Sequence, residues 1–114
     1  MLDDYGRRIR DGQVWVLDHA GRFCGVLVLE GLGDDAILLD NVAVAPPEKG
    51  KGHGRTLISF AETEARRRCC REIRLYTHVL MTENIALYRK LGFVETGRVT
   101  EKGYNRVYMV KALR

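Results

Sequence analysis

The chain has 114 residues, of which 46% are hydrophobic and 30% charged, and its formal net charge is +4. This length and composition predict one small globular domain over residues 1–114, because such a chain can bury one ordinary core. No apolar run approaches the ~18 residues that a membrane helix needs, which argues against a membrane protein, and the modest basic charge favours anionic partners.

The N-terminal stretch "MLDDYGRRIRDG" is charged and shows no secretory signal. Three cysteines, Cys24, Cys69 and Cys70, form an odd set without metal-ligand spacing. This usage indicates reduced thiols in a cytoplasmic protein rather than a disulfide framework. For the neighbouring pair we expect one buried and one half-exposed thiol at the end of a helix.

The first half of the chain predicts a short helix followed by three strands. Leu2, Tyr5 and Ile9 lie near helical spacing, and the later segments are apolar runs bounded by turn residues. The third run, "AILLDNVAV", is almost continuously apolar and therefore predicts a central strand, which Pro46 and Pro47 end. The expected elements are a helix at 2–11 and strands at 13–18, 23–31 and 36–44, the first two strands forming a hairpin.

The second half predicts two helices, one strand and a final hairpin. Apolar residues recur every four positions from Leu57 to Cys69, which is typical of a helix with one buried face. Thr82 can cap the second helix and Gly92 can end it. The expected elements are a helix from about 54 to 69, a strand at 72–79, a helix between 82 and 92, and strands at 93–100 and 105–113. Hairpins at both ends and a strand–helix–strand crossover between them predict a mixed α/β sheet with helices on its faces.

A glycine-rich loop, "EKGKGHGR", lies between the central strand and the next helix. It places Gly50, Gly52 and Gly54 among the basic side chains of Lys49, Lys51 and Arg55. Glycines at alternate positions let backbone N–H groups face one way, and a helix N-terminus adds unpaired N–H groups and partial positive charge. The loop therefore predicts a binding site for a phosphate or pyrophosphate.

Three phosphate-binding motifs can be distinguished here. A P-loop does not fit, because Gly50 and Gly54 are one residue too close and Arg55 stands where lysine belongs. A dinucleotide fingerprint does not fit, because the third glycine comes one residue early. The remaining pattern, [Q/R]-x-x-G-x-[G/A] after an apolar strand, matches at Lys49, Gly52 and Gly54, with lysine in the first position.

With this loop the sequence resembles the GNAT superfamily of acetyl-CoA-dependent N-acetyltransferases. The stretch "LDNVAVAPPEKGKGHGRTLISFAETEAR" is similar to the family's central strand, pyrophosphate loop and first long helix. The stretch "RLYTHVLMTENIALYRKLGFVETGR" is similar to its second half, with the pattern N-x-x-x-Y-x-K-x-G-F from Asn84 to Phe93. The resemblance covers residues 13–112 and implies a GNAT-like fold, with a central twisted mixed sheet flanked by helices.

The sequence departs from the family in two places. Lysine at position 49 replaces glutamine or arginine but keeps a cation. The family's usual first strand and helix, which often form part of the acceptor wall, have no counterpart, so we expect a fold that lacks them. A truncated start, a minimal family member and a site completed by a second subunit would each account for this. The last would make the protein a homodimer, and light scattering tests it.

The resemblance implies transfer of an acetyl group from acetyl-CoA to a primary amine by direct attack in a ternary complex, with no metal. The pyrophosphate would lie on the loop amides and the pantetheine arm would pair with the central strand. A bulge near Asn41 would splay the sheet and free an amide for the thioester oxygen. The implied cofactor-binding residues are Val42, Ala43, Val44, Lys49, Gly50, Lys51, Gly52, His53, Gly54, Arg55 and Asn84. For His53, a solvated side chain is favoured over a phosphate contact.

Tyr88 is the candidate general acid, and it shares a helix face with Asn84 because the two are four residues apart. The alternative is a core tyrosine whose hydroxyl reaches the rim. Asp40, just before the expected bulge, is the candidate general base, directly or through a water, and Glu30 is its competitor. A structural role is the alternative for Asp40, and the family includes enzymes with no single essential base.

Two other functions stay open at this point. A non-catalytic CoA-binding module of the same fold is one, although the intact Asn84 and Tyr88 argue against it. A basic nucleic-acid-binding domain is the other; its binding would weaken steeply with salt and be indifferent to CoA. The arginine run 66–68 has no interleaved aromatic residues, so it predicts a solvated basic face rather than a nucleic-acid site.

Overall fold

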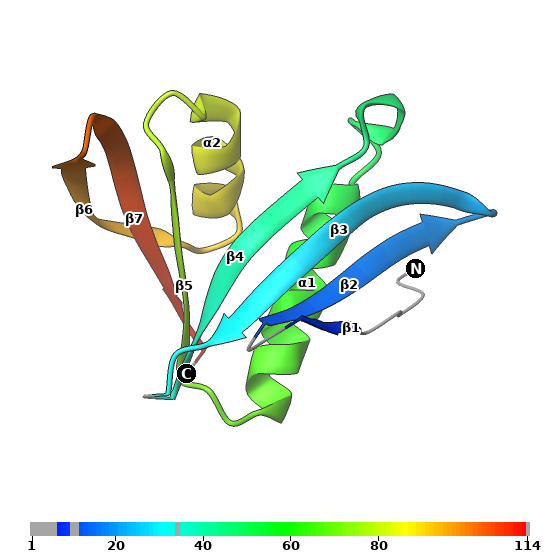
Figure 1. Ribbon diagram of the computed structural model, residues 1–114, viewed down its shortest axis with the longest axis horizontal. Coiled ribbons are helices and arrows are strands. Elements are labelled where there is room, and N and C mark those ends of the chain that lie inside the picture. The colour runs from blue at the N-terminus through cyan, green and yellow to red at the C-terminus, as the bar shows by residue number, and fades with distance from the viewer. Residues whose placement is uncertain (1–6, 10–11, 34, 114) are drawn as a thin grey trace.

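The computed structural model describes residues 7–9, 12–33 and 35–113, which form one mixed sheet and two α-helices (Figure 1). Its seven strands follow the order β1-β2-β3-β4-β5-β7-β6. Neighbouring strands are antiparallel except β4 and β5, which are parallel because α1 crosses over between them. The strands are β1 (Arg7–Ile9), β2 (Gly12–His19), β3 (Arg22–Gly31), β4 (Ala36–Val44), β5 (Glu72–His78), β6 (Val94–Glu101) and β7 (Tyr104–Ala112). The helices are the 3-10 turn η1 (Pro46–Glu48), α1 (His53–Arg67) and α2 (Thr82–Lys90).

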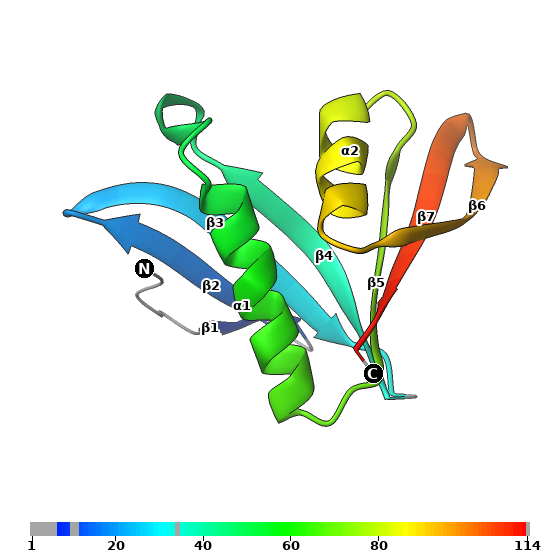
Figure 2. The same cartoon turned by 180° about the vertical axis from the view of Figure 1, so that it is seen from behind.

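Both α-helices bury their apolar side chains against one face of the sheet. The long helix α1 crosses β2, β3 and β4, lying behind them in Figure 1 and in front of them in Figure 2. Leu57 of α1 and Tyr88 of α2 belong to the same buried cluster as Leu27 and Leu29 of β3. Alternate residues of a strand point to one face, so β3 turns these two leucines towards the helices. No helix in the described ranges is long and apolar enough to cross a membrane.

The predicted central strand is confirmed. It spans Ala36–Val44 and is the fourth of seven strands in the sheet. Pro46 and Pro47 end it by starting the 3-10 turn, because proline has no N–H for a strand ladder. The helix, strand and final hairpin expected after it are also present, with ends that differ by one or two residues.

The helix predicted at residues 2–11 is wrong where the structure describes this segment. Arg7–Ile9 form β1, which pairs antiparallel with β2. The outer edge of β2 would otherwise present unpaired backbone groups, and an added strand satisfies them. Three apolar residues near helical spacing favour a helix less strongly than pairing with the β2 edge favours a strand. Residues 1–6 and 10–11 lie outside the described residues.

Two helix ends also differ from expectation. Thr82 does not cap α2; it is the first helical residue after Met81, and no side chain caps this end. A tight turn fixes this start, since the Met81 N–H donates to the His78 carbonyl. Cys69 lies beyond the end of α1 in a left-handed conformation with φ 62°, so its side chain is exposed rather than part of the apolar stripe. Cys70 is half-buried, and the expectation of one buried thiol in this pair is therefore wrong.

Gly92 ends α2 as predicted. Its φ of 103° reverses the chain, and the N–H of Phe93 donates to the Tyr88 carbonyl at 2.9 Å. Only glycine adopts this conformation without strain, so the residue serves as a helix C-terminal cap. This cap fixes the last turn of α2, which carries Tyr88.

Candidate functional site

The sheet opens between β4 and β5. The two strands pair only over 36–38 and 72–74, although β4 continues to Val44 and β5 to His78. Figures 1 and 2 both show the strands diverging towards their C-terminal ends. Over 39–44, the edge of β4 that faces β5 therefore has no strand partner in the described part of the chain. Its backbone N–H and C=O groups on that side are free to pair with a ligand.

A bulge in β4 marks the start of this opening. In the ladder with β3, Val28 pairs with Asn41 and Leu29 pairs with Leu39, so Asp40 is an extra residue. A bulge bends its strand and increases the local twist, which accounts for the divergence of β4 from β5. The bulge expected near Asn41 is thus confirmed.

An open cleft of about 700 Å³ occupies this opening. It is lined by Val42, Ala43, Val44, Lys49, Gly50, Gly52, His53, Gly54, Arg55, Ile58, Leu80, Met81, Thr82, Glu83, Asn84, Leu87 and Tyr88. The structure therefore brings together Tyr88 and every predicted cofactor-binding residue except Lys51. Asp40 does not line the cleft; it is exposed on the bulge of β4.

The glycine loop forms one rim of the cleft. Gly50 and Gly52 have φ values of 82° and 84°, a left-handed conformation that other residues adopt only with strain. Gly52 is the N-terminal cap of α1, and the first N–H that bonds back to it is that of Thr56. The N–H groups of the first turn have no intrahelical partner, and no acidic side chain occupies that turn. This end of α1 is suited to an anion.

Tyr88 lies on the opposite wall of the cleft. It is 9% exposed and packs against Phe93, with ring centroids 5.7 Å apart. Burial raises the pKa of its phenol, so the group stays protonated at neutral pH. Within the described residues, no side chain hydrogen bonds to its hydroxyl. Asn84, one helical turn earlier on α2, also lines the cleft, as the four-residue spacing predicted.

Several apolar residues of the cleft were not predicted from the sequence. Leu80 is 77% exposed and Met81 is 47% exposed, and both directly precede α2. Two large apolar side chains left in water beside a cleft favour contact with a ligand. Their only signal in the sequence is an apolar pair directly before a helix start.

His53 is not solvated, so the alternative favoured from the sequence is wrong. Its side chain is 14% exposed, and Nε2 lies 3.2 Å from Oε1 of Glu48. Glu48 itself is buried and also contacts Lys51 and Arg22, at 3.4 and 3.6 Å. Burial alone would raise the pKa of Glu48, but His53 and the two cations outweigh it and hold the pKa below its ordinary value. Lys51 is thus drawn towards Glu48, which explains why it does not line the cleft.

The sequence matches a known protein family over most of its length. The family model for the GNAT acetyltransferase domain matches residues 10–95, which include the β4 edge, the glycine loop and Tyr88. The chain belongs to the GNAT acetyltransferase family. It is accordingly an acyltransferase, and the resemblance noted in the sequence is confirmed.

Solved GNAT structures have the same fold. A nourseothricin acetyltransferase is 25% identical over 92% of this chain and 67% of its own, with a TM-score of 0.83. The IAA acetyltransferase of Bacillus cereus is 23% identical over 90% of this chain and 79% of its own, with a TM-score of 0.82. An acetyltransferase of Bacillus subtilis in complex with CoA is 21% identical over 93% and 80%, with a TM-score of 0.84. No curated protein matched the sequence.

The two candidate bases of this GNAT domain lie outside the cleft lining. Asp40 comes two residues after Leu38, the last β4 residue that pairs with β5. Glu30 is half-buried on β3 and lies opposite Leu38 in the ladder. Asp40 is thus the carboxylate at the point where the strands begin to part.

The arginine run at the end of α1 is engaged within the chain. Arg67 and Arg68 pair with Glu64 at 2.6 and 2.7 Å, and Arg66 donates to the Leu113 carbonyl at 2.6 Å. These arginines lie at the opposite end of α1 from the glycine loop. Their contacts favour a structural role over nucleic-acid binding.

Proposed function

We propose that this GNAT protein transfers the acetyl group of acetyl-CoA to a primary amine by direct attack within a ternary complex. The observation that carries the proposal is that one cleft joins the free edge of β4, the glycine loop and Tyr88. A volume of about 700 Å³ is within the range of small-molecule sites. The CoA held by the Bacillus subtilis neighbour, and the acetyl-CoA held by a putative streptothricin acetyltransferase of Bacillus anthracis, support acetyl-CoA as co-substrate.

The chain would hold acetyl-CoA at two places. The amides of 50–55 would bind the pyrophosphate, aided by the partial positive charge of the α1 N-terminus and by the exposed Lys49 and Arg55. The free edge of Val42 to Val44 would pair with the amide groups of the pantetheine arm as a neighbouring strand would. Asn84 would bond the same arm from α2. The bulge leaves one amide of this edge to donate to the thioester oxygen as negative charge develops there.

Tyr88 would act as the general acid. The amine nitrogen forms a bond to the acetyl carbon, and the carbon–sulfur bond breaks with its electron pair on sulfur. The nitrogen, now bonded to the acetyl carbon, loses its surplus proton to solvent. Tyr88 donates its phenolic proton to that sulfur and recovers a proton from solvent. Burial raises the pKa of Tyr88, which keeps the proton available throughout the neutral range.

Asp40 would act as the general base. It is exposed on the bulge, at the start of the opening, where an acceptor amine can approach. It takes one proton from the ammonium form of the acceptor, directly or through one water, before attack. Glu30 is the alternative carboxylate, and the two can be separated by substitution.

The experiment is an acceptor screen with product detection. The full chain is incubated with acetyl-CoA and a panel of small amines, amino acids, aminoglycosides and peptides with free N-termini or lysines. Thiol release is followed together with the mass of the acceptor. The proposal expects an acetylated amine and an equal amount of free CoA. Thiol release without an acetylated product would mean hydrolysis, and no turnover with any amine would count against the proposal.

A further inference from the structure

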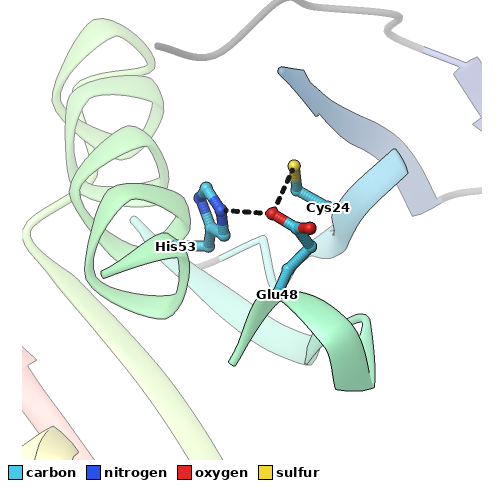
Figure 3. Close-up of side chains that lie close together, drawn as sticks. All are labelled: Cys24, Glu48 and His53. Atoms are coloured by element: carbon cyan, nitrogen blue, oxygen red, sulfur yellow. Dashed lines mark hydrogen bonds and ion pairs between the residues drawn. The ribbon is translucent and has the colours of Figure 1, made fainter. Parts of the chain in front are cut away.

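Next to the glycine loop, three potential metal ligands from different elements meet (Figure 3). Cys24 comes from β3, Glu48 from η1 and His53 from the first residue of α1. In Figure 3 the thiol and the imidazole both point at one carboxylate oxygen, Oε1 of Glu48. The Cys24 side chain is fully buried and Glu48 is 5% exposed. Acetyl transfer as described above uses none of these three side chains.

The spacing of the three ligand atoms fits a tetrahedral metal ion. The Sγ–Oε1 distance is 3.6 Å, the Nε2–Oε1 distance is 3.2 Å, and all three atoms lie within 4.8 Å of one another. Zinc bonds of ordinary length place such ligand atoms roughly 3.4–3.6 Å apart. The Sγ–Oε1 edge already has this length, and the Nε2–Oε1 edge is about 0.2 Å shorter than it. Binding therefore requires the His53 ring to move so that Nε2 reaches the required distance from both other ligand atoms.

The two oxygens of Glu48 have partly different neighbours. Oε1 faces the thiol and the imidazole, whereas Oε2 faces Arg22 at 3.6 Å, and Lys51 lies 3.4 Å from both oxygens. A carboxylate that binds a metal through one oxygen commonly keeps hydrogen-bonding partners on the other. Arg22 can play that part on Oε2, and Lys51 can do so if it gives up its contact with Oε1. Their side chains are 60% and 49% exposed, so water screens their repulsion of a cation.

We propose that Cys24, Glu48 and His53 form a binding site for one divalent metal ion of the zinc class. Thiolate, imidazole and carboxylate together suit zinc better than magnesium or calcium, which prefer oxygen ligands alone. On binding, the Cys24 thiol gives its proton to solvent, because the thiolate is the ligand. The bound ion fastens the two ends of the glycine loop, Glu48 and His53, to strand β3.

Cobalt(II) is the probe for this site, because a thiolate bound to it gives a near-ultraviolet charge-transfer band and a tetrahedral site gives intense visible bands. Chelator-treated full chain is titrated with Co²⁺, and Zn²⁺ is then added to displace it. Wild type is compared with Cys69→Ser/Cys70→Ser, which removes the only other cysteines. We expect one Co²⁺ per chain in both proteins, with the charge-transfer band, and its loss on adding Zn²⁺.

Substitution of the ligands then locates the ion. In the Cys69→Ser/Cys70→Ser background, Cys24→Ser should abolish the charge-transfer band. His53→Gln and Glu48→Gln should keep the thiol but weaken binding by at least about tenfold. Circular dichroism checks the fold, and if Cys24→Ser does not fold, His53→Gln decides, since its side chain is partly exposed.

Three results would overturn the proposal. The first is no stoichiometric binding to wild type, which would leave a hydrogen-bonded cluster only. The second is a signal that disappears in Cys69→Ser/Cys70→Ser, which would place the ion on the exposed pair. The third is a charge-transfer band that survives Cys24→Ser or, if that variant does not fold, an unchanged Co²⁺ affinity in His53→Gln. None of these results bears on acetyl-CoA binding, so the two proposals are tested separately.

Discussion

Gly54 on α1 and Leu87 on α2 face each other across the cleft, and a Cβ at position 54 would lie 3.6 Å from Leu87 Cδ2. This is an ordinary contact distance, and Gly54 is not in the left-handed region. A side chain is therefore tolerated here, unlike at Gly50 and Gly52, where φ is positive. Position 54 is the best place to test the proposed pyrophosphate site without damaging the fold.

Gly54→Asp should weaken acetyl-CoA binding by about fivefold or more, because a carboxylate near the pyrophosphate costs about 1–4 kcal/mol at roughly 4 Å. The protein itself should not lose stability, because an acidic residue suits the first turn of a helix. Gly54→Ala is the matched control and should bind normally. Thermal shifts with and without acetyl-CoA measure both effects. If Gly54→Asp and Gly54→Ala bind acetyl-CoA with equal affinity, the pyrophosphate does not bind near position 54.

Tyr88→Phe should lower kcat by about 10² or more and leave acetyl-CoA affinity unchanged, because only the proton donor is lost. The ring keeps its packing against Phe93, so the fold should be intact. Steady-state kinetics with the best acceptor from the screen provides the measurement. Tyr104→Phe, at an exposed tyrosine on β7, is the control. A kcat close to that of wild type would leave Tyr88 with a packing role.

Asp40→Asn should reduce kcat/KM by about 10² at neutral pH, because the amide cannot take a proton from the acceptor. Glu30→Gln should have little effect. A more basic buffer would partly restore Asp40→Asn, since more of the amine is then already neutral. The pH profile of kcat/KM for both variants tests this assignment. If Glu30→Gln loses activity and Asp40→Asn does not, Glu30 rather than Asp40 is the general base.

Glu64→Gln should lower the free energy of unfolding at pH 7 by about 1 kcal/mol. The bond from Arg67, helped by Arg68 and opposed by burial, holds the pKa of Glu64 below its ordinary value of 4.5. A depressed pKa stabilises the fold above the ordinary glutamate pKa, and this contribution disappears as pH falls through the folded-state pKa. The difference from wild type should therefore shrink in strong acid.

Urea unfolding at pH 7 and pH 3 measures that difference. Asp18→Asn is the control, because Asp18 forms no ion pair with any of the described residues. A Glu64→Gln deficit of the same size at both pH values would show that packing rather than charge is responsible.

Gly25→Ala should destabilise the protein by about 1–3 kcal/mol. A Cβ at this position would lie 2.6 Å from the Ala43 carbonyl oxygen and 3.1 Å from Leu57 Cδ1, so β3, β4 or α1 must shift. Gly31→Ala on the same strand has nothing within 4 Å and is the control. Denaturant midpoints give the comparison. Equal stability of the two variants would mean that β3 at position 25 and the Ala43 carbonyl lie farther apart than in this structure.

Features carried by a local pattern could be predicted from the sequence. The apolar run of β4, the alternating glycines and the spacing of Asn84 and Tyr88 each signal their role within a few residues. The cleft follows because the β4–α1–β5 crossover brings the loop and α2 to the same end of the sheet. These parts of the site could therefore be predicted from the sequence alone.

Features that depend on distant residues could not be predicted. Cys24 and Glu48 are 24 positions apart, and only the pairing of β3 with β4 brings them together. His53 lies only five positions from Glu48, but the sequence does not show that Glu48 is itself buried, so the burial of His53 beside it was missed. The β1 strand likewise depends on the open edge of β2 rather than on its own residues.

Amide hydrogen exchange with and without acetyl-CoA tests the central claim most directly. The account predicts slower exchange over 42–44 and 50–55 when acetyl-CoA is present, because these amides would donate to the ligand. The β6–β7 hairpin, which does not line the cleft, should exchange at the same rate in both conditions. Unchanged exchange over both the β4 edge and the glycine loop at saturating acetyl-CoA would contradict it.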